Sequence, residues 1–232
     1  MHGRACLRPG RTVCLAAGAM LALLACSAVQ AKPVDQVAAV FNHPAEKARL
    51  ATMLEPVTHA LHGAAAVQGH FRQRNFLHGL PQPLESSGTF MVARGLGVDW
   101  HVLKPFNAET ILTATRLVQK NADGSEQILG ADHQPGLAAV ERTFDAMFTL
   151  DLDQLEQRFK LYGQEKDGTW TLGLKPRDAA LAAHLRAVVI VGDEHPQQVT
   201  LYQAGGDRTE IRFADVSVDA KLNAAQRRLF QP

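Results

Sequence analysis

The sequence predicts an α+β fold in which a curved antiparallel sheet packs against helices. Its 232 residues contain roughly nine strand-like segments that follow one another through short turns, as in successive hairpins. The helical segments are set apart from them, one before the first strand and a pair in the middle of the chain. No repeat, linker or low-complexity stretch interrupts the chain after residue 31, so we expect residues 32–232 to form a single domain.

Residues 1–31 have the features of a secretory signal peptide, because arginines precede an apolar run from Val13 to Ala25 and small residues follow it. That run is too short to be a membrane-spanning helix. Two forms of processing are open. Cleavage after Val29-Gln30-Ala31 would release a soluble protein. Leu23-Leu24-Ala25-Cys26 instead resembles a bacterial lipobox, in which Cys26 would be acylated and would anchor the protein.

The helices are expected in two places. Leucines at helical intervals before residue 66 predict the first helix, with Pro44 at its start and a kink or split at Pro56. The periodicity of residues 137–150 predicts a second helix, and residues 151–159 predict a third that follows it directly. Together the last two form a helical insertion between two groups of strands.

The strands are predicted from alternation of apolar and polar side chains between turn residues. Residues 110–120 alternate throughout and are read as one strand. The end of the chain is expected to hold a short extended segment and a polar tail. The nine expected strands are residues 64–77, 88–94, 98–103, 110–120, 159–163, 169–174, 185–191, 198–203 and 209–213, with shorter extended segments at 125–130 and 216–218.

The first strand of the hairpin from Gly88 to Leu112 should present a row of large side chains to one face of the sheet. Successive side chains of a strand point to opposite faces, so Phe90, Val92 and Arg94 share one side. Arg94 therefore either ends an apolar row or turns outward at the rim. A cation at the mouth of an apolar sheet face is suited to holding a lipid.

The second strand of this hairpin continues the apolar face. Gly95 and Gly97 permit the chain reversal, since glycine adopts positive φ without a steric cost. Trp100 and Val102 then lie on one face of the returning strand. Pro105 should end that strand, because proline has no N–H to donate to a neighbouring strand.

The rest of the sequence lacks the signatures of catalysis, metal binding and nucleic-acid binding. The net charge of +1 gives no electrostatic reason to expect a nucleic-acid partner. The ten histidines do not occur at metal-ligand spacing with carboxylates or cysteines. There is no nucleophile elbow, phosphate-binding loop or dinucleotide fingerprint, so we expect no catalytic residues and no cofactor. This pattern favours a binding protein.

Several short segments resemble the LolA-like family of periplasmic lipoprotein carriers. One strand is similar to the family's F-x-Q segment, and the hairpin is similar to its G-x-(hydrophobic)-x-x-x-R-P-x-x-x-x-W and the residues that follow. A late strand is similar to its D-G-x-x-T-x-I-x-F. The matching residues are Phe71-Arg72-Gln73, Ser87-Gly88-Thr89-Phe90 with Arg94 and Trp100-His101, Lys104-Pro105 with Glu109 and Ile111, and Gly206-Asp207-Arg208-Thr209 with Ile211 and Phe213.

Two positions depart from the family pattern. Gly95 stands where the family has a proline after the arginine, and Thr113-Ala114-Thr115 follows where the family places an aspartate-glycine turn. We interpret the chain as a divergent member.

The resemblance implies an incomplete, half-open antiparallel β-barrel covered by helices, with an apolar cavity for acyl chains. It also implies that Arg94 contacts the helices and holds them closed as a lid. The side chains expected to line or support the cavity are Phe71, Phe90, Val92, Trp100 and Val102.

The implied function is that of a monomeric periplasmic carrier, not an enzyme. It would take an acylated lipoprotein or lipid from an inner-membrane exporter to an outer-membrane acceptor. A first alternative is an outer-membrane acceptor of the same fold, similar to LolB and lipidated at Cys26. A second is a periplasmic accessory enzyme of envelope lipid synthesis, which would need Asp193, His195 and a serine to meet in a pocket.

Overall fold

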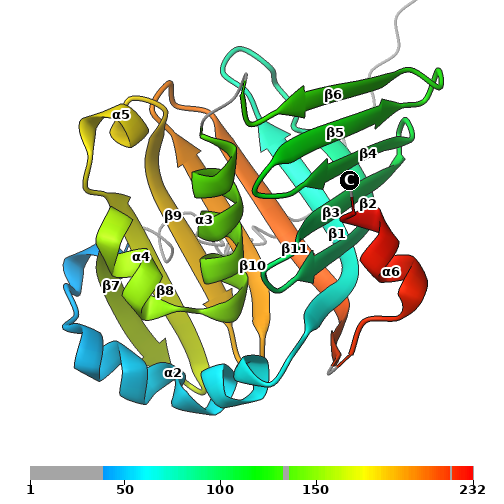
Figure 1. Cartoon of the computed structure of the whole chain (residues 1–232). Helices are drawn as coiled ribbons and strands as arrows, with labels where there is room; N and C mark the ends of the chain where they lie inside the picture. Colours follow the sequence, from blue (N-terminus) through cyan, green and yellow to red (C-terminus); the bar gives the residue numbers. More distant parts are fainter. Residues whose placement is uncertain (1–38, 133–135, 220, 232) are drawn as a thin grey trace, which may run out of the picture. The chain divides into compact units, whose positions relative to one another are not determined.

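The structure, a computed structural model, describes residues 39–132, 136–219 and 221–231, all within the compact unit Pro33–Pro232. Eleven strands form one sheet (Figure 1). The strands are β1 (Ala66–Phe76), β2 (Leu84–Ala93), β3 (Gly97–Lys104), β4 (Ala108–Leu112), β5 (Arg116–Asn121), β6 (Glu126–Gly130), β7 (Phe159–Lys166), β8 (Thr169–Pro176), β9 (Leu185–Gly192), β10 (Pro196–Gln203) and β11 (Arg208–Asp219). The helices are the 3-10 helix η1 (Val40–Asn42), α2 (Lys47–His62), α3 (Leu137–Thr149), α4 (Leu152–Arg158), α5 (Ala179–Ala182) and α6 (Ala224–Leu229).

The sheet consists of two meanders that meet at its centre. Its strand order is β6-β5-β4-β3-β2-β1-β11-β10-β9-β8-β7, and neighbouring strands are antiparallel. The pairing of β1 with β11 joins the two halves, so Phe71 lies beside Gly88 on one side and Phe213 on the other. Since β6 and β7 are the two edges and do not pair with each other in the described part of the chain, the sheet stays open. The predicted α+β fold with an incomplete antiparallel barrel is confirmed.

Both faces of the sheet bury side chains. The inner face carries the main core, to which α2, α3 and α4 contribute. The outer face carries a smaller core beneath α6. Alternation along the strands separates the two sets, as at Met91 and Val92, because neighbouring side chains point in opposite directions.

Helix α2 is continuous, so the expected split at Pro56 is wrong. The helix begins at Lys47, three residues after the predicted start at Pro44, which instead forms an isolated bridge to Tyr162. Pro56 lies on the exposed side of the helix. Because proline has no N–H, the carbonyl one turn before it loses its helical hydrogen bond, and on the exposed side this carbonyl can accept a hydrogen bond from water. The buried leucines on the opposite side hold the helix in place.

Helices α3 and α4 follow each other as predicted. Leu150, in the left-handed region at φ 54°, ends α3 and turns the chain. The carboxylate of Asp151 then caps α4 by accepting a hydrogen bond from the backbone N–H of Gln154 at 3.1 Å. In Figure 1 α3 lies over the inner face between the two meanders, whereas α4 lies over β7 and β8.

The single strand predicted for residues 110–120 is two strands, β4 and β5, joined by a turn. The hydroxyl oxygen of Thr113 accepts hydrogen bonds from the backbone N–H groups of Thr115 and Arg116, at 3.3 and 3.0 Å. A hydroxyl that bonds to nearby backbone offers the chain a turn in place of a ladder. This turn stands where the family pattern has its aspartate-glycine turn.

The C-terminal segment differs from the expected polar tail. Strand β11 runs without a break to Asp219, and α6 follows it. Asn223 and Gln226 form a reciprocal capping box at the start of α6. Leu222 and Phe230 flank the helix and are buried on the outer face, so this short helix is anchored at both ends.

Candidate functional site

The side chains that the sequence assigns to the binding surface lie together on the inner face. Phe90 lies directly opposite Trp100, and Val92 lies opposite Val98. Phe71 comes from β1, on the other side of β2, and stacks on Trp100 of β3 with ring centroids 3.8 Å apart. The alternation expected for this hairpin is thus observed.

Helix α3 covers this aromatic surface with one side chain that the sequence reasoning did not single out for the site. The ring of Phe148 lies 5.5 Å from that of Phe90 and 5.3 Å from that of Phe213, centroid to centroid. Phe90 and Phe213 are themselves 4.8 Å apart. The helical spacing around Phe148 marked it as apolar, but nothing in the sequence indicated that it would meet β2 and β11.

The expected cavity-lining residues are therefore packed core in this state of the protein. Phe71, Phe90 and Val92 are each about 3% exposed, whereas Trp100 and Val102 are half-buried. An acyl chain that binds to this surface must take the place of the α3 side chains. Because one apolar contact would replace another, such an exchange has no large intrinsic cost.

Arg94 ends the apolar row and reaches the helices. Its guanidinium Nη2 donates a 2.8 Å hydrogen bond to the backbone carbonyl of Leu61, in the last turn of α2. Carbonyls at a helix C-terminus lack intrahelical partners and carry partial negative charge, so they favour a cation. Arg94, Leu61 and Phe148 line the same small pocket of about 10 Å³.

Asp145 of α3 lines this pocket as well. Burial raises the pKa of its carboxyl group, and the positive charge of Arg94 opposes that rise. Its Oδ1 atom is buried and has no hydrogen-bond partner among the residues that the structure describes. Arg94 consequently acts electrostatically on α3 while it bonds to α2.

The backbone around Arg94 is fixed without the family's proline. The N–H of Arg94 donates a 3.0 Å hydrogen bond to the carbonyl of Ala65, which precedes β1. Gly95 and Gly97 make the turn with φ of +66° and +149°. A side chain at Gly97 would overlap the carbonyl of Leu112, so this position needs glycine for close packing as well as for its backbone conformation.

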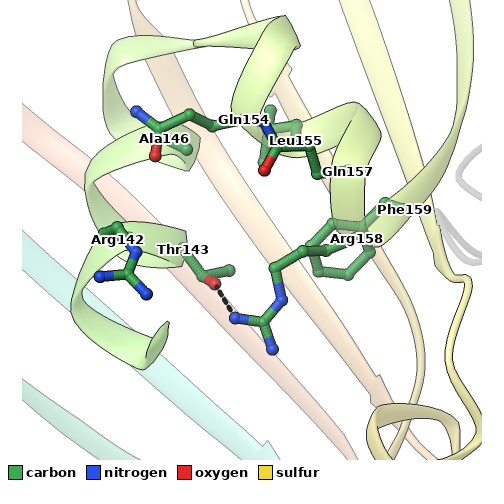
Figure 2. Close-up of a pocket in the computed structure, with 8 residues that line it drawn as sticks. All are labelled: Arg142, Thr143, Ala146, Gln154, Leu155, Gln157, Arg158 and Phe159. Atoms are coloured by element: carbon green, nitrogen blue, oxygen red, sulfur yellow. Dashed lines mark hydrogen bonds between the residues drawn. The ribbon is translucent and has the colours of Figure 1, made fainter. Parts of the chain in front are cut away.

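A second pocket, of about 120 Å³, lies between α3 and α4 (Figure 2). Arg158 at the end of α4 reaches across it. Its Nη1 donates to the carbonyl of Ala139 at 3.1 Å and to the hydroxyl oxygen of Thr143 at 3.3 Å. These bonds tie α4 to α3, so we expect the two helices to move together. Arg142 and two glutamine side chains complete the polar lining.

Asp193 and His195, the residues of the enzyme alternative, occupy the turn between β9 and β10. The carboxylate of Asp193 accepts hydrogen bonds from the N–H of Glu194 and from Nε2 of Gln197, both at 2.6 Å. Its backbone carbonyl accepts from the indole N–H of Trp170 at 2.7 Å. These contacts stabilise a turn, and they use the carboxylate that a catalytic histidine would need.

Residues 1–38 lie outside the described part of the chain, and with them the predicted signal peptide and Cys26. Within the part that is described, no helix is long and apolar enough to cross a membrane. The same residues contain no group of three or more histidine, cysteine or acidic side chains placed to hold a metal ion.

Several solved structures are similar to this chain at low sequence identity. A LolA superfamily protein from Nitrosomonas europaea is 9% identical, with a TM-score of 0.43, over 78% of this chain and 96% of that one. The lipoprotein LppX of Mycobacterium tuberculosis is 12% identical, with a TM-score of 0.42, over 77% and 99% of the two chains. The Pseudomonas aeruginosa MucA/MucB complex matches at 18% identity and a TM-score of 0.43, over 77% of this chain and 60% of that one.

Sequence comparison gives the family directly. No curated protein sequence matches the chain. The family model described as outer membrane lipoprotein carrier protein LolA matches residues 62–231, from the end of α2 to the end of α6. That range contains the whole sheet, the α3–α4 pair and Arg94. The chain therefore belongs to the LolA family of outer membrane lipoprotein carrier proteins.

Proposed function

We propose that the protein is a carrier that binds the acyl chains of a lipoprotein or lipid on the inner face of its sheet. It moves this cargo from the inner to the outer membrane through the periplasm, as a binding protein and not as an enzyme. The observation that carries the proposal is the aromatic inner face beneath α3, with Arg94 bonded to α2 at its edge.

The apolar surface is suited to an acyl chain. Burial of each methylene contributes about 0.8 kcal/mol, so a fatty acyl chain needs no polar partner to bind firmly. The side chains that would contact it come from three adjacent strands, β1, β2 and β3. In the closed state Phe148 occupies this surface, and the acyl chain replaces it when α3 moves away with α4.

Arg94 serves in this proposal as the latch of the closed state. A hydrogen bond from a charged group contributes about 1.5–3 kcal/mol when it is shielded from water, and less at an exposed position such as this one. That amount favours the closed state without making it permanent. The affinity for cargo can then exceed the cost of opening, as reversible transfer requires.

The proposal is tested by native mass spectrometry of the purified protein, followed by titration with a fluorescent fatty acid. The expected result is a bound lipid or lipoprotein in the purified sample and reversible binding of the fatty acid. Arg94→Leu should still bind the fatty acid, with faster opening of α2. Absence of bound lipid, together with absence of fatty-acid binding in both proteins, would refute the carrier function.

The lipobox-like segment that ends at Cys26 favours a second candidate function. In that form the protein is an outer-membrane acceptor anchored through an acylated cysteine. Its inner face would bind cargo in the same way, but the protein would receive the cargo at the outer membrane instead of carrying it there. The mass of the mature N-terminus separates the two, since an acylated Cys26 excludes the freely diffusing carrier.

A further inference from the structure

A further cavity, of about 480 Å³, lies between the β2–β3 turn and the C-terminal segment, and we call it the outer cavity. Its volume falls within the roughly 300–1,000 Å³ that is typical of small-molecule sites. Part of its lining is apolar and comes from Leu96, Leu222 and Phe230. Leu96 is 41% exposed, so apolar surface at this position faces solvent.

The charged part of the lining is cationic. Arg94 comes from the end of β2, Lys221 from the connection between β11 and α6, and Arg227 from α6. None of the described residues that line this cavity is acidic. An anion bound in this cavity would be attracted by all three charges. This combination fits a molecule with an anionic head and a hydrocarbon tail.

Arg94 belongs to this cavity and to the small pocket under the helices at the same time. On the inner side its guanidinium donates to the carbonyl of Leu61, and its charge acts on the carboxyl group of Asp145, which lines the same pocket. A carboxylate or phosphate carries a full negative charge and can accept two parallel N–H bonds from one guanidinium, which a single backbone carbonyl does not offer. An anion held by Lys221 and Arg227 offers Arg94 such an acceptor on the outer side, where it competes with the Leu61 carbonyl for the guanidinium.

We propose that this outer cavity binds the anionic head and first methylenes of an amphiphile, and that its occupation releases the hold of Arg94 on α2. The head is a phosphate or carboxylate. The release of α2 rests on the carrier function proposed above, whereas the binding site does not. A carrier with this device would give up its cargo preferentially where anionic amphiphiles are abundant.

The test uses octyl phosphate as the probe, measured by calorimetry with the full-length mature protein. We expect the Lys221→Gln/Arg227→Gln double variant to bind at least about tenfold more weakly. Arg228→Gln is the matched control, because Arg228 is exposed on the same helix and does not line the cavity. It should bind within about twofold of the wild type.

Octyl glucoside, with the same tail and a neutral head, should not compete with the probe. Amide hydrogen exchange in residues 57–62 of α2 should rise on addition of octyl phosphate in the wild type and not in the double variant. Binding is measured separately to phosphatidylglycerol vesicles and to monomeric octyl phosphate. The comparison distinguishes recognition of a head group in a bilayer from recognition of a free amphiphile. Binding of either supports the shared chemistry.

Equal binding of octyl phosphate by the wild type and the double variant would overturn the site, as would equal binding of octyl glucoside. Competition by inorganic phosphate at the same concentration would overturn the role of the apolar floor. Binding without any change in α2 exchange would overturn the release of Arg94. If the carrier function itself is wrong, fatty-acid binding is absent while the charge-dependent binding of octyl phosphate remains, so the two failures differ.

Discussion

The substitution Phe148→Ala should lower the stability of the closed protein and at the same time raise its affinity for the proposed cargo. Phe148 is 6% exposed and packs against Phe90 and Phe213. Loss of a buried phenylalanine side chain costs about 3–5 kcal/mol, to which each aromatic pair adds about 0.5–1.5 kcal/mol beyond its buried area. We take about 3 kcal/mol for Phe148→Ala, since an exchangeable helix relaxes more easily than a rigid core.

If the acyl chain replaces Phe148, this cost falls on the closed state alone. A penalty of 3 kcal/mol corresponds to a change of about 150-fold in the ratio of open to closed protein. The fatty-acid affinity of Phe148→Ala should therefore rise by about ten- to a hundredfold, the lower value allowing for contacts that Phe148 makes with bound lipid. Its free energy of unfolding should fall by about 3 kcal/mol in urea.

The assay is displacement of a fluorescent fatty acid, measured together with urea denaturation. Val140→Ala on the same helix is the control, because Val140 is 46% exposed. Its affinity should be unchanged, and its stability should change by less than about 0.5 kcal/mol. A destabilised Phe148→Ala protein whose fatty-acid affinity is unchanged or weaker would refute the displacement of α3.

Three further substitutions test separate parts of the structure. Arg94→Leu should raise hydrogen exchange in the last turn of α2 by about tenfold, while Arg94→Lys should restore part of the protection. Burial, followed by the charge of a neighbouring glutamate, raises the pKa of Asp99 to about 6, so ionisation of this carboxyl destabilises the fold as pH rises from about 4 through 6. In urea titrations, Asp99→Asn should therefore raise the free energy of unfolding by about 1–2 kcal/mol above pH 7 and by almost nothing at pH 4. This increase is about half of what the pKa shift corresponds to, because Asp99 is partly exposed. Gly163→Ala should cost about 1–3 kcal/mol in thermal or urea unfolding, because its methyl group would overlap Leu50 of α2, whereas Gly130→Ala, with open space around it, should be neutral.

The hairpin that carries Arg94 could be predicted from sequence because its physics is local. Alternation along a strand assigns Phe90 and Val92 to one face whatever else the chain does. The break at Thr113 could not be read in this way, since the threonine keeps the alternating pattern and the turn depends on its hydroxyl bonding to the backbone. The contact between Phe148 and Phe213 joins segments far apart in sequence, and periodicity contains no information about such partners.

The helices that cover the inner face are joined by polar bonds, while the surface beneath them is apolar. Arg158 ties α4 to α3, an exposed ion pair between Lys47 and Asp153 at 2.6 Å ties α2 to α4, and Arg94 ties α2 to the sheet. Exposed ion pairs contribute little to stability, and their contribution falls further with added salt. In the proposed carrier, acyl cargo would exchange one apolar contact for another and would change none of these bonds directly. The polar bonds would then set how often the helices open, and the apolar face would set how tightly cargo is held. Of the three, only the bond made by Arg94 connects a helix to the end of β2 beside the outer cavity, so under the proposal an anion bound in that cavity would act on the inner face through Arg94.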